Sequence, residues 1–409
     1  MHPSQYLRGT KSKLLEGRKI VVGVSGSIAA VETVRLVREL MRHGAEVVVV
    51  MSHDAMRMVS AEALHFASGK RPITEITGQV EHVELFAPGK GRADLFLIAP
   101  ATANTISKIV NGIADTPVTT CASVAIGNGV PILVVPAMHG DMMRNSFISN
   151  NVGKLKAVGA SIIPPILEEG EAKLPPPDII AVHVIRRLAR GPWAGRSIVI
   201  LGGSTVERVD DVRALTNLGS GRTAVELAAQ AYLRGANVTL WMGECKVSMP
   251  QFIGAKRFET LHDIEKLIEK QEETLKKASA IIVPAAIADY MIEKPRAGKI
   301  DSSKEEKLTL TLVRGPKILP RLRSIAPPPT LVVGFKLDSK LGSQEMLDRA
   351  RKLLETDGLD AVVSNDSSSM GGTETKLVLV RSNREPKPIA GTKEAAAAEL
   401  LDELAGDLK

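Results

Sequence analysis

Residues 17–30, GRKIVVGVSGSIAA, and residues 195–204, GRSIVILGGS, begin two similar stretches of the chain. In each, an aliphatic run ends in glycine and small polar residues. An amphipathic segment, a glycine and a second aliphatic run follow, at 36–52 (LVRELMRHGAEVVVVMS) and at 224–243 (AVELAAQAYLRGANVTLWMG). This order predicts a strand, a tight turn, a helix and a parallel strand, the unit that opens a doubly wound sheet. We therefore predict an α/β protein with two doubly wound, Rossmann-like domains and mainly parallel sheets.

Two helix-breaking stretches separate these units. Residues 174–178 read LPPPD, and residues 190–196 read RGPWAGR. Proline and glycine end helices and favour a connection. A chain of 409 residues is long enough for two domains. We therefore predict a first domain at 1–190 and a second at 191–409.

The composition argues against several classes of protein. No apolar run reaches the roughly 18 residues of a membrane-spanning helix, and the first residues contain no apolar signal segment. The net charge is +7, but aromatic residues make up only 3% of the chain, which favours small anionic ligands over nucleic acid. The cysteines Cys121 and Cys245 lie in different halves, so no disulfide framework is expected. We expect a cytoplasmic protein without a nucleic-acid or membrane partner.

A first candidate site follows the apolar run at 95–98. Residues 99–115 read APATANTISKIVNGIAD, and ligands of open α/β sheets lie where strands end. Asn104, Lys108, Gly112 and Asp115 are spaced to share one face of a helix. A helix start with Asn104 as its N-cap is the structural alternative.

Three further features belong to the same half. The turn Gly23–Ser27 would let a phosphate approach a helix N-terminus, and Ser52 ends the next strand. Residues 136–142, PAMHGDM, follow another aliphatic run, and His82 stands in the sequence EHV. A lone histidine is more often structural than functional, so His82 is a candidate only because the other motifs occur in the same half.

Together, the PATANT stretch at 100–105, the polar residues behind it, the PAMH stretch at 136–139 and His82 resemble the flavin-dependent phosphopantothenoylcysteine decarboxylases. The resemblance covers about residues 15–185. Thr102 replaces the usual serine, and His139 stands where many members have asparagine. The resemblance implies a flavodoxin-like domain with FMN. Its chemistry oxidises the cysteinyl thiol to a thioaldehyde, releases CO₂ and re-reduces the product to 4′-phosphopantetheine.

The resemblance also assigns roles to single residues. Asn104 would hold the substrate carboxylate, and His82 would be the base in the oxidation. His139 and Met142 would contact the substrate. The residues expected to contact FMN are Gly23, Ser25, Gly26, Ser27, Ser52, Ala101, Thr102, Ala103, Ala137 and Met138.

Members of this family have a flap after the PAMH stretch, and in this chain that flap departs from the common pattern. Most members carry a proton-donating cysteine there, whereas residues 167–175 read LEEGEAKLP, as in archaeal-type members. Cys121 lies elsewhere and is expected to pack near the flavin. The remaining candidates for the proton donor are solvent, Glu168, Glu169, Glu171 and Lys173.

A second candidate site lies in the other half. Residues 202–204, GGS, end a predicted strand, and the next helix is not expected before about Thr223. The insertion between them, TVERVDDVRALTNLGSGR at 205–222, is typical of a binding loop. Its last part, from Asn217 to Gly221, would offer an anion site at the helix N-terminus. An ordinary surface loop is the alternative.

This loop, PAAIADY at 284–290, GKI at 298–300 and VGF at 333–335 resemble the phosphopantothenate–cysteine ligases over about residues 195–370. The resemblance implies that 4′-phosphopantothenate is joined to L-cysteine through an acyl-nucleotidylate, with Mg²⁺ and CTP. Asn217 and Ala286 would contact the acyl group, and Lys299 would neutralise charge during nucleotidyl transfer. The expected nucleotide contacts are Ala285, Asp289, Lys299, Gly315, Pro316, Lys317, Ile318, Phe335 and Lys352.

Two departures leave the nucleotide open between CTP and ATP. Thr356 stands where the ligases have a second lysine, and residues 336–338, KLD, replace the commoner small residues. The two resemblances together predict a bifunctional enzyme of coenzyme A biosynthesis. Members assemble as trimers through the flavin domain and as dimers through the ligase domain, so a homo-oligomer, up to a dodecamer, is expected.

Three alternatives remain. The first is another flavin decarboxylase or a prenyltransferase on the same fold, which the ligase motifs disfavour. The second is a non-catalytic, regulatory flavoprotein half with only the ligase active. The third is a tandem NAD(P) dehydrogenase, which is disfavoured because neither half has GxGxxG followed about 20 residues later by an acidic residue.

Overall fold

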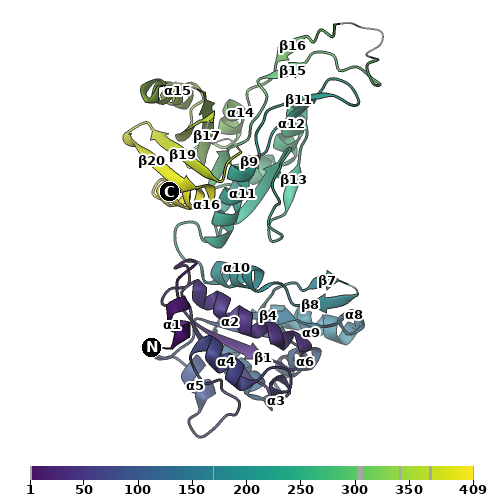
Figure 1. The fold of residues 1–409 in the computed structure, drawn as a ribbon, viewed down its shortest axis with the longest axis vertical. Coiled ribbons are helices and arrows are strands. Elements are labelled where there is room, and N and C mark those ends of the chain that lie inside the picture. Colours follow the sequence, from purple (N-terminus) through teal and green to yellow (C-terminus); the bar gives the residue numbers. More distant parts are fainter. Residues whose placement is uncertain (1, 169, 302–306, 340–341, 368–370, 409) are drawn as a thin grey trace. The chain divides into compact units, whose positions relative to one another are not determined.

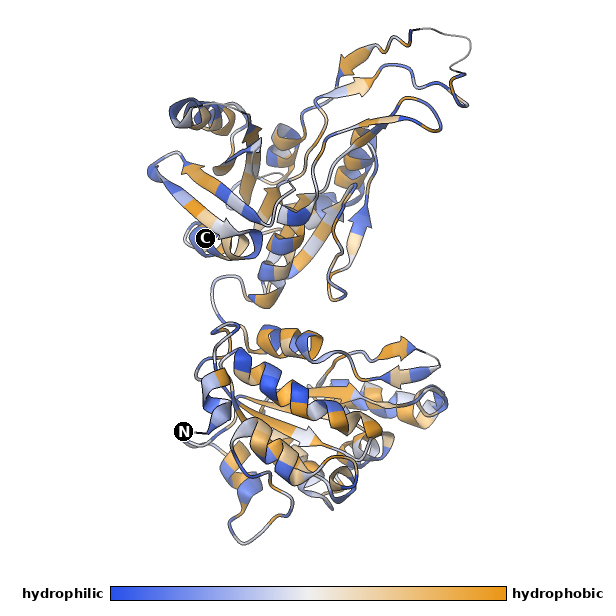
Figure 2. Cartoon of the chain, in the orientation of Figure 1, coloured by the Kyte–Doolittle hydropathy of each residue, from blue (hydrophilic) through white to orange (hydrophobic). Residues whose placement is uncertain are grey.

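The computed structural model divides the chain into two α/β units, Met1–Leu188 and Ala189–Lys409 (Figure 1). The structure describes residues 2–168, 170–301, 307–339, 342–367 and 371–408. In both units the strands of the central sheet are mostly hydrophobic (Figure 2), because helices cover both faces of the sheet.

Five parallel strands form the sheet of the first unit, in the order β2-β1-β3-β4-β6. This is the flavodoxin-like order, in which the chain direction across the sheet reverses between β1 and β3 and a ligand crevice is expected there. The strands are β1 (Lys19–Val24), β2 (Glu46–Met51), β3 (Leu95–Ala101), β4 (Ile132–Pro136) and β6 (Ser161–Ile162).

Helices flank this sheet, and a small antiparallel sheet of order β5-β8-β7 lies after β4 in the chain. Its strands are β5 (Met138–His139), β7 (Ile166–Glu168) and β8 (Glu171–Lys173). The helices are α1 (Pro3–Leu7), η1 (Ile28–Glu32), α2 (Thr33–Arg42), α3 (His53–Met56), α4 (Ala61–Ser68), α5 (Glu81–Phe86), α6 (Ala103–Val110), α7 (Pro117–Gly127), α8 (Gly140–Arg144), α9 (Ser146–Ala157) and α10 (Pro177–Leu188).

The polar row predicted along one helix from Asn104 to Asp115 is wrong in its second half. Helix α6 ends at Val110, and Gly112 has φ +70°, a left-handed conformation that glycine adopts freely and that stops a helix. Asp115 therefore lies in the connection to α7. It nevertheless meets Lys108, because the chain turns back and leaves Nζ 2.7 Å from Oδ2.

The second unit contains an eight-stranded sheet of order β13-β12-β9-β14-β17-β18-β19-β20. The first six strands are parallel and follow the Rossmann order 3-2-1-4-5-6, and β19 and β20 add an antiparallel hairpin at the edge. The predicted doubly wound, mainly parallel fold is thus confirmed. The strands are β9 (Ser197–Gly202), β12 (Asn237–Met242), β13 (Ala255–Arg257), β14 (Ala280–Val283), β17 (Leu331–Asp338), β18 (Ala361–Asp366), β19 (Glu374–Arg381) and β20 (Arg384–Thr392).

The two faces of this sheet carry different helices. One face packs on α11 (Arg222–Leu233) and α16 (Lys393–Ala405), and the other on α12 (Leu261–Lys270) and α14 (Ile318–Ile325). Among the described residues, no helix is long and apolar enough to cross a membrane. The remaining elements are α13 (Glu272–Lys276), α15 (Ser343–Thr356) and two hairpins, β10 (Val206–Arg208) with β11 (Ala214–Thr216) and β15 (Tyr290–Ile292) with β16 (Leu312–Arg314).

Trp193 anchors the start of the second unit to its last helix. The side chain is only 2% exposed, and its Nε1 donates a hydrogen bond of 2.8 Å to the carbonyl of Leu401 in α16. The indole thereby fills the core and satisfies its polar atom at the same time.

Substituting Trp193 should destabilise the second unit in two separable steps. Trp193→Phe keeps most of the packing but removes the hydrogen bond to the Leu401 carbonyl, which should cost about 0.5–1.5 kcal/mol. Trp193→Ala also creates a cavity, and its cost should be about 3–5 kcal/mol. Calorimetry of the full chain would measure both, with Phe147→Ala, at a 78% exposed site, as a control near zero. Equal effects for the two Trp193 variants would contradict the role of the hydrogen bond.

Two candidate active sites

A cavity of about 340 Å³ opens where the strands of the first sheet end. The residues that line it follow β1, β2, β3 and β4, so it occupies the crevice that the strand order predicts. They are Gly26, Ser27, Ser52, Asp54, Thr102, Ala103, Asn104, Thr105, Lys108, Thr116, Thr119, Ala137, Met138 and Met142.

Hydrogen bonds of Ser25 join two of the loops that form this cavity. Its Oγ donates to the carbonyl of Pro100 at 2.7 Å and accepts the N–H of Thr102 at 2.9 Å. Next to it, a Cβ on Gly26 would collide with Cβ of Asp54, so only glycine fits at this position. Ser25 therefore holds the two loops of the cavity wall together from the buried side. Gly26 leaves space that a side chain would fill.

Asn104 is free to face the cavity because another residue caps its helix. Thr102 is the N-cap of α6, and its Oγ1 accepts the N–H of Thr105 at 3.2 Å. The capping role considered for Asn104 is therefore wrong. Lys108, one turn further, also lines the cavity, and its ammonium holds the pKa of Asp115 below the ordinary value.

The remaining residues predicted for this site do not line the cavity. Gly23, Ser25 and Ala101 are buried behind the cavity wall and do not line it. His139 is exposed and caps α8, accepting the N–H of Asp141 at 3.4 Å. His82, in α5, also lies outside the lining, and its buried Nδ1 has no hydrogen-bond partner among the described residues.

The flap forms a hairpin that pairs with the PAMH segment. In the register of β5 and β8, Met138 lies opposite Ala172 and His139 opposite Glu171. Because neighbouring residues point to opposite faces of a sheet, Glu171 and His139 share the face away from Met138, which lines the cavity. Lys173 Nζ lies 3.2 Å from Oε2 of Glu168, the other described carboxylate of the flap. The remaining candidate donor, Glu169, lies outside the described residues.

Cys121 lies in the hydrophobic core on α7 and does not line the cavity. Burial raises the pKa of its thiol to about 12, and the charge of Glu81 adds to the shift. A thiol with so little thiolate at neutral pH is a poor nucleophile.

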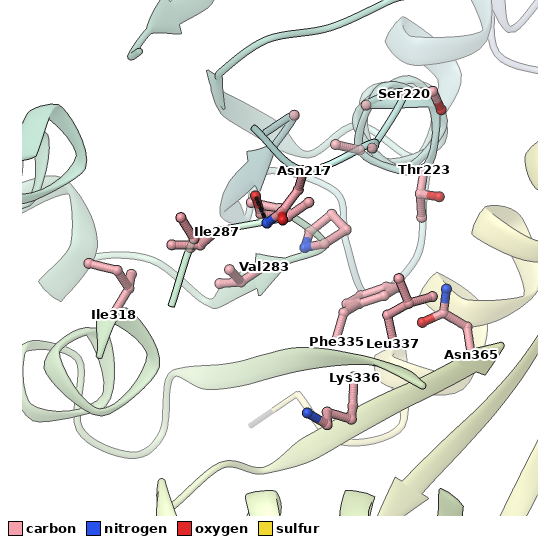
Figure 3. Close-up of a pocket in the computed structure, with 18 of the residues that line it drawn as sticks. Asn217, Ser220, Thr223, Val283, Ile287, Ile318, Phe335, Lys336, Leu337 and Asn365 are labelled. Carbon is pink, nitrogen blue, oxygen red and sulfur yellow. Dashed lines mark hydrogen bonds between the residues drawn. The ribbon is translucent and has the colours of Figure 1, made fainter. Parts of the chain in front are cut away.

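A second cavity, of about 540 Å³, opens at the corresponding edge of the second sheet (Figure 3). Phe335, Leu337 and Asn365 lie together on one side of it, across from Ser220 and Thr223. Its lining residues are Gly203, Asn217–Ala224, Val283–Asp289, Pro316–Leu319, Phe335–Leu337, Leu353, Asp357, Asn365, Gly371, Thr375 and Lys393.

Two threonines hold the binding loop against the end of β14. Thr205 Oγ1 accepts the N–H of Ala288 at 2.9 Å, and Thr216 Oγ1 donates to the carbonyl of Thr205 at 2.7 Å. Asn217 Nδ2 then donates to the carbonyl of Ala286 at 3.0 Å, the contact dashed in Figure 3. The amide of Asn217 is thus held with its second N–H and its oxygen available to a ligand.

Most of the residues predicted for the nucleotide line the same cavity. Asp289 and Lys317 form an exposed ion pair, with Nζ 2.5 Å from Oδ1. Gly315 supports them from behind, donating its N–H to the carbonyl of Asp289 at 3.0 Å. The other predicted residues on the cavity wall are Ala285, Ala286, Pro316, Ile318 and Phe335.

Lys299 and Lys352 do not reach this cavity. Lys299 lies between β15 and β16, where the carboxylates of Asp211 and Asp210 accept the N–H groups of Gly298 and Ile300 at 3.1 and 3.0 Å. On α15 it is Leu353 that lines the cavity, since one residue changes the helical direction by about 100°.

Several lining residues were not identified from the sequence. Asn365 had a usable signal, because a polar pair follows the aliphatic run of β18. Arg222, Thr375 and Lys393 had none, because their meeting depends on how distant elements pack. The residues missed are Arg222, Thr223, Lys336, Asn365, Thr375 and Lys393, whereas Ser220 lies in the predicted anion-binding stretch from Asn217 to Gly221.

Known protein families match both halves of the chain. The family model described as Flavoprotein matches residues 8–189, and that of the DNA/pantothenate metabolism flavoprotein C-terminal domain matches residues 193–408. The chain is 40% identical, over 99% of both chains, to the coenzyme A biosynthesis bifunctional protein CoaBC of Thermococcus kodakarensis. It is 38% identical to that of Methanocaldococcus jannaschii, over 99% of this chain and 97% of the relative.

Solved structures resemble single halves of the chain. The C-terminal domain of CoaBC is 23% identical, with a TM-score of 0.44, over 53% of this chain and 97% of that one. The FMN-dependent cysteine decarboxylase SpaF is 26% identical, with a TM-score of 0.37, over 42% of this chain and 98% of that one.

The fold and the two family matches define the class: a flavoprotein domain followed by a pantothenate-metabolism domain. The chain belongs to the family of the coenzyme A biosynthesis bifunctional proteins CoaBC. It is a bifunctional enzyme with a decarboxylase and a phosphopantothenate–cysteine ligase activity, as the sequence predicted. The alternative of a regulatory flavoprotein half is not favoured.

The two cysteines should differ sharply in reactivity. Cys121 is fully buried with a raised pKa, whereas Cys245 is half-buried. In the folded protein near pH 8, iodoacetamide should modify Cys245 at least roughly 100-fold faster than Cys121. Peptide mass spectrometry would measure both rates, with the unfolded chain as the control in which they converge. Faster labelling of Cys121 in the folded protein would contradict its place in the core.

Proposed function

We propose that the two halves catalyse consecutive steps toward 4′-phosphopantetheine. Residues 191–409 would join 4′-phosphopantothenate to L-cysteine, using CTP and Mg²⁺, and residues 1–190 would decarboxylate the product with FMN. The observation that carries this proposal is a cavity at the strand ends of each sheet. The first cavity is lined by residues of the decarboxylase motifs, and the second by residues of the ligase motifs. A cytoplasmic location suits these substrates and remains a proposal.

The residues around the first cavity fit FMN. Gly26 leaves room for a phosphate, and the N-termini of η1 and α6, capped by Ser27 and Thr102, would donate N–H groups to it. Ala103 and Met138 offer apolar contacts for a flavin ring. When bound, FMN supplies the electron acceptor and donor for oxidation and re-reduction of the substrate. Asn104 would orient the substrate carboxylate through its amide N–H groups.

His82 would need a second copy of the chain to serve as the base. It lies outside the cavity of its own chain, while the family chemistry places a base at the substrate thiol. We therefore propose trimers through the flavin domain, with FMN at the subunit contacts. Dimers through the ligase domain would complete an assembly of up to twelve chains.

In the second cavity, Asn217 would orient the carboxylate of 4′-phosphopantothenate. The carboxylate oxygen would attack the α-phosphate of CTP, forming an acyl-cytidylate and releasing pyrophosphate. The amine of L-cysteine would then attack the acyl carbon and displace CMP. Lys317, which pairs with Asp289 in the free site, could exchange that partner for a phosphate, and Mg²⁺ would bind through the nucleotide phosphates. Lys299, which lies outside the cavity lining, would neutralise charge during nucleotidyl transfer.

Replacing Gly26 by alanine should abolish flavin binding. The new Cβ would collide with Asp54, and the loop would have to shift into the cavity. Flavin absorbance of the purified protein would measure the loss. Gly78→Ala is the matched control, because nothing lies within 4 Å of the added atom. Full flavin content in Gly26→Ala would place the cofactor elsewhere.

Replacing Asn217 by alanine should remove the ligase and spare the decarboxylase. We expect ligation to fall by roughly 100-fold or more, as for the loss of an oriented amide at a reacting centre. Mass spectrometry of full-length enzyme given FMN, Mg²⁺, 4′-phosphopantothenate, cysteine and either CTP or ATP would follow both products and show the preferred nucleotide. Phosphopantothenoylcysteine supplied directly should be decarboxylated at the wild-type rate. Formation of neither product by the wild type would refute the proposed function.

A further inference from the structure

One buried carboxylate of the second unit lines neither cavity and has no role in the proposed function. Asp210 stands in the turn between β10 and β11, where it is only 2% exposed although the next two residues, Asp211 and Val212, are exposed. A buried carboxylate must be compensated by hydrogen bonds or by a cation. The groups that compensate Asp210 therefore show which parts of the chain it holds together.

The carboxylate of Asp210 accepts hydrogen bonds from two segments. Oδ1 accepts the N–H groups of Val212 at 2.8 Å and Arg213 at 2.6 Å, both in its own turn. Oδ2 accepts the N–H of Ile300 at 3.0 Å and pairs with Nη1 of Arg213 at 2.5 Å. Burial alone would raise the pKa of this carboxyl, but the three N–H groups and the guanidinium hold the pKa well below its usual range. Asp210 thus remains ionised while it joins the two segments.

The second segment is held on both sides of one lysine. Asp210 accepts the N–H of Ile300, and Asp211 accepts the N–H of Gly298 through Oδ2 at 3.1 Å. Lys299 lies between these two bonds, so adjacent carboxylates fix the backbone before and after it. Its own side chain is exposed and makes no hydrogen bond or ion pair with another residue that the structure describes. The backbone of this lysine is therefore fixed, while its ammonium is available to a ligand.

Two further bonds join the same pair of segments. Arg213 Nη1 donates to the carbonyl of Ile300 at 3.3 Å, and the N–H of Arg296 donates to the carbonyl of Val209 at 3.0 Å. At the other end of the hairpin, β11 leads directly into Asn217. One hydrogen-bonded frame thus carries both the amide proposed to orient the acyl substrate and the lysine proposed to act in nucleotidyl transfer.

We propose that Asp210 positions Lys299 for nucleotidyl transfer in the ligase reaction. This inference rests on the role proposed for Lys299 and adds the group that holds it in place. A cation stabilises the charge that develops on an α-phosphate only from a defined position, and a displacement of about 1 Å can lower a rate about 100-fold. Because a lysine side chain is flexible, a fixed backbone limits the region that its ammonium reaches. Asp210 acts through Lys299 and touches neither substrate.

A double-mutant cycle in the full-length enzyme tests this role. Lys299→Met should lower the kcat for pyrophosphate release roughly 100-fold. Asp210→Asn should lower it about 10- to 100-fold, because an amide has one acceptor oxygen in place of two. In both variants the KM for 4′-phosphopantothenate and for CTP should change less than about threefold. Adding Asp210→Asn to Lys299→Met should cause less than about a threefold further loss, since the lysine that it positions is already absent.

Two more variants separate positioning from folding. Asp211→Ala removes only the bond to Gly298 from an exposed site, so kcat should fall about 3- to 10-fold, and only while Lys299 is present. Asp263→Asn is the matched control, because that carboxylate also accepts backbone N–H groups, including that of Thr260 at 3.0 Å where α12 begins. It should lower the thermal transition of the second unit in calorimetry and leave kcat within about twofold of the wild type.

Losses that multiply in the double variant would show a general structural effect and overturn the inference. A wild-type kcat in Asp210→Asn or in Lys299→Met would overturn it as well. If Asp210→Asn does not fold, Asp211→Ala with and without Lys299→Met decides in the same way. A wild-type enzyme that forms no phosphopantothenoylcysteine would instead refute the proposed function on which the inference rests.

Discussion

Parallel strand pairing is the constraint on which both sites depend. It places the carboxyl ends of consecutive strands at one edge of a sheet, so loops far apart in the chain meet there. In the first sheet β1 pairs in parallel with both β2 and β3, which brings the turns after all three strands to one cavity. In the second sheet the same rule joins the ends of β9, β14 and β17. The helix N-termini that follow these strands then supply N–H groups where anionic ligands are proposed to bind.

Buried hydroxyl groups stabilise the two sites in a similar way. Ser25 connects the turn after β1 to the turn after β3, and Thr205 connects the loop after β9 to the segment after β14. Each hydroxyl lies beside a strand end and bonds to backbone groups of another loop. A small polar residue suits this position, because a larger side chain would separate the loops that it joins. The cavities are consequently bounded by loops fixed to one another, which is a requirement for orienting a substrate.

The sequence predicted the fold and much of the site composition because these depend on local patterns. Aliphatic runs marked the strands, and the motifs after them marked the cavity walls. The extent of the helix after Asn104 could not be predicted, because the left-handed Gly112 ends it and the meeting of Lys108 with Asp115 depends on the path of the connection. Lys393 was missed for a different reason: it lies 171 residues after Arg222, and only the packing of α16 on α11 brings the two together.

The cavity of the second sheet is lined by helices from both of its faces. Both proposed ligands carry phosphate groups, and ligands of like charge bound side by side would repel one another. The starts of α11 and α14, which pack on opposite faces of the sheet, both line this cavity, so N–H groups from either face can offset that repulsion. The two reacting groups, a carboxylate and an α-phosphate, would then approach only near Asn217.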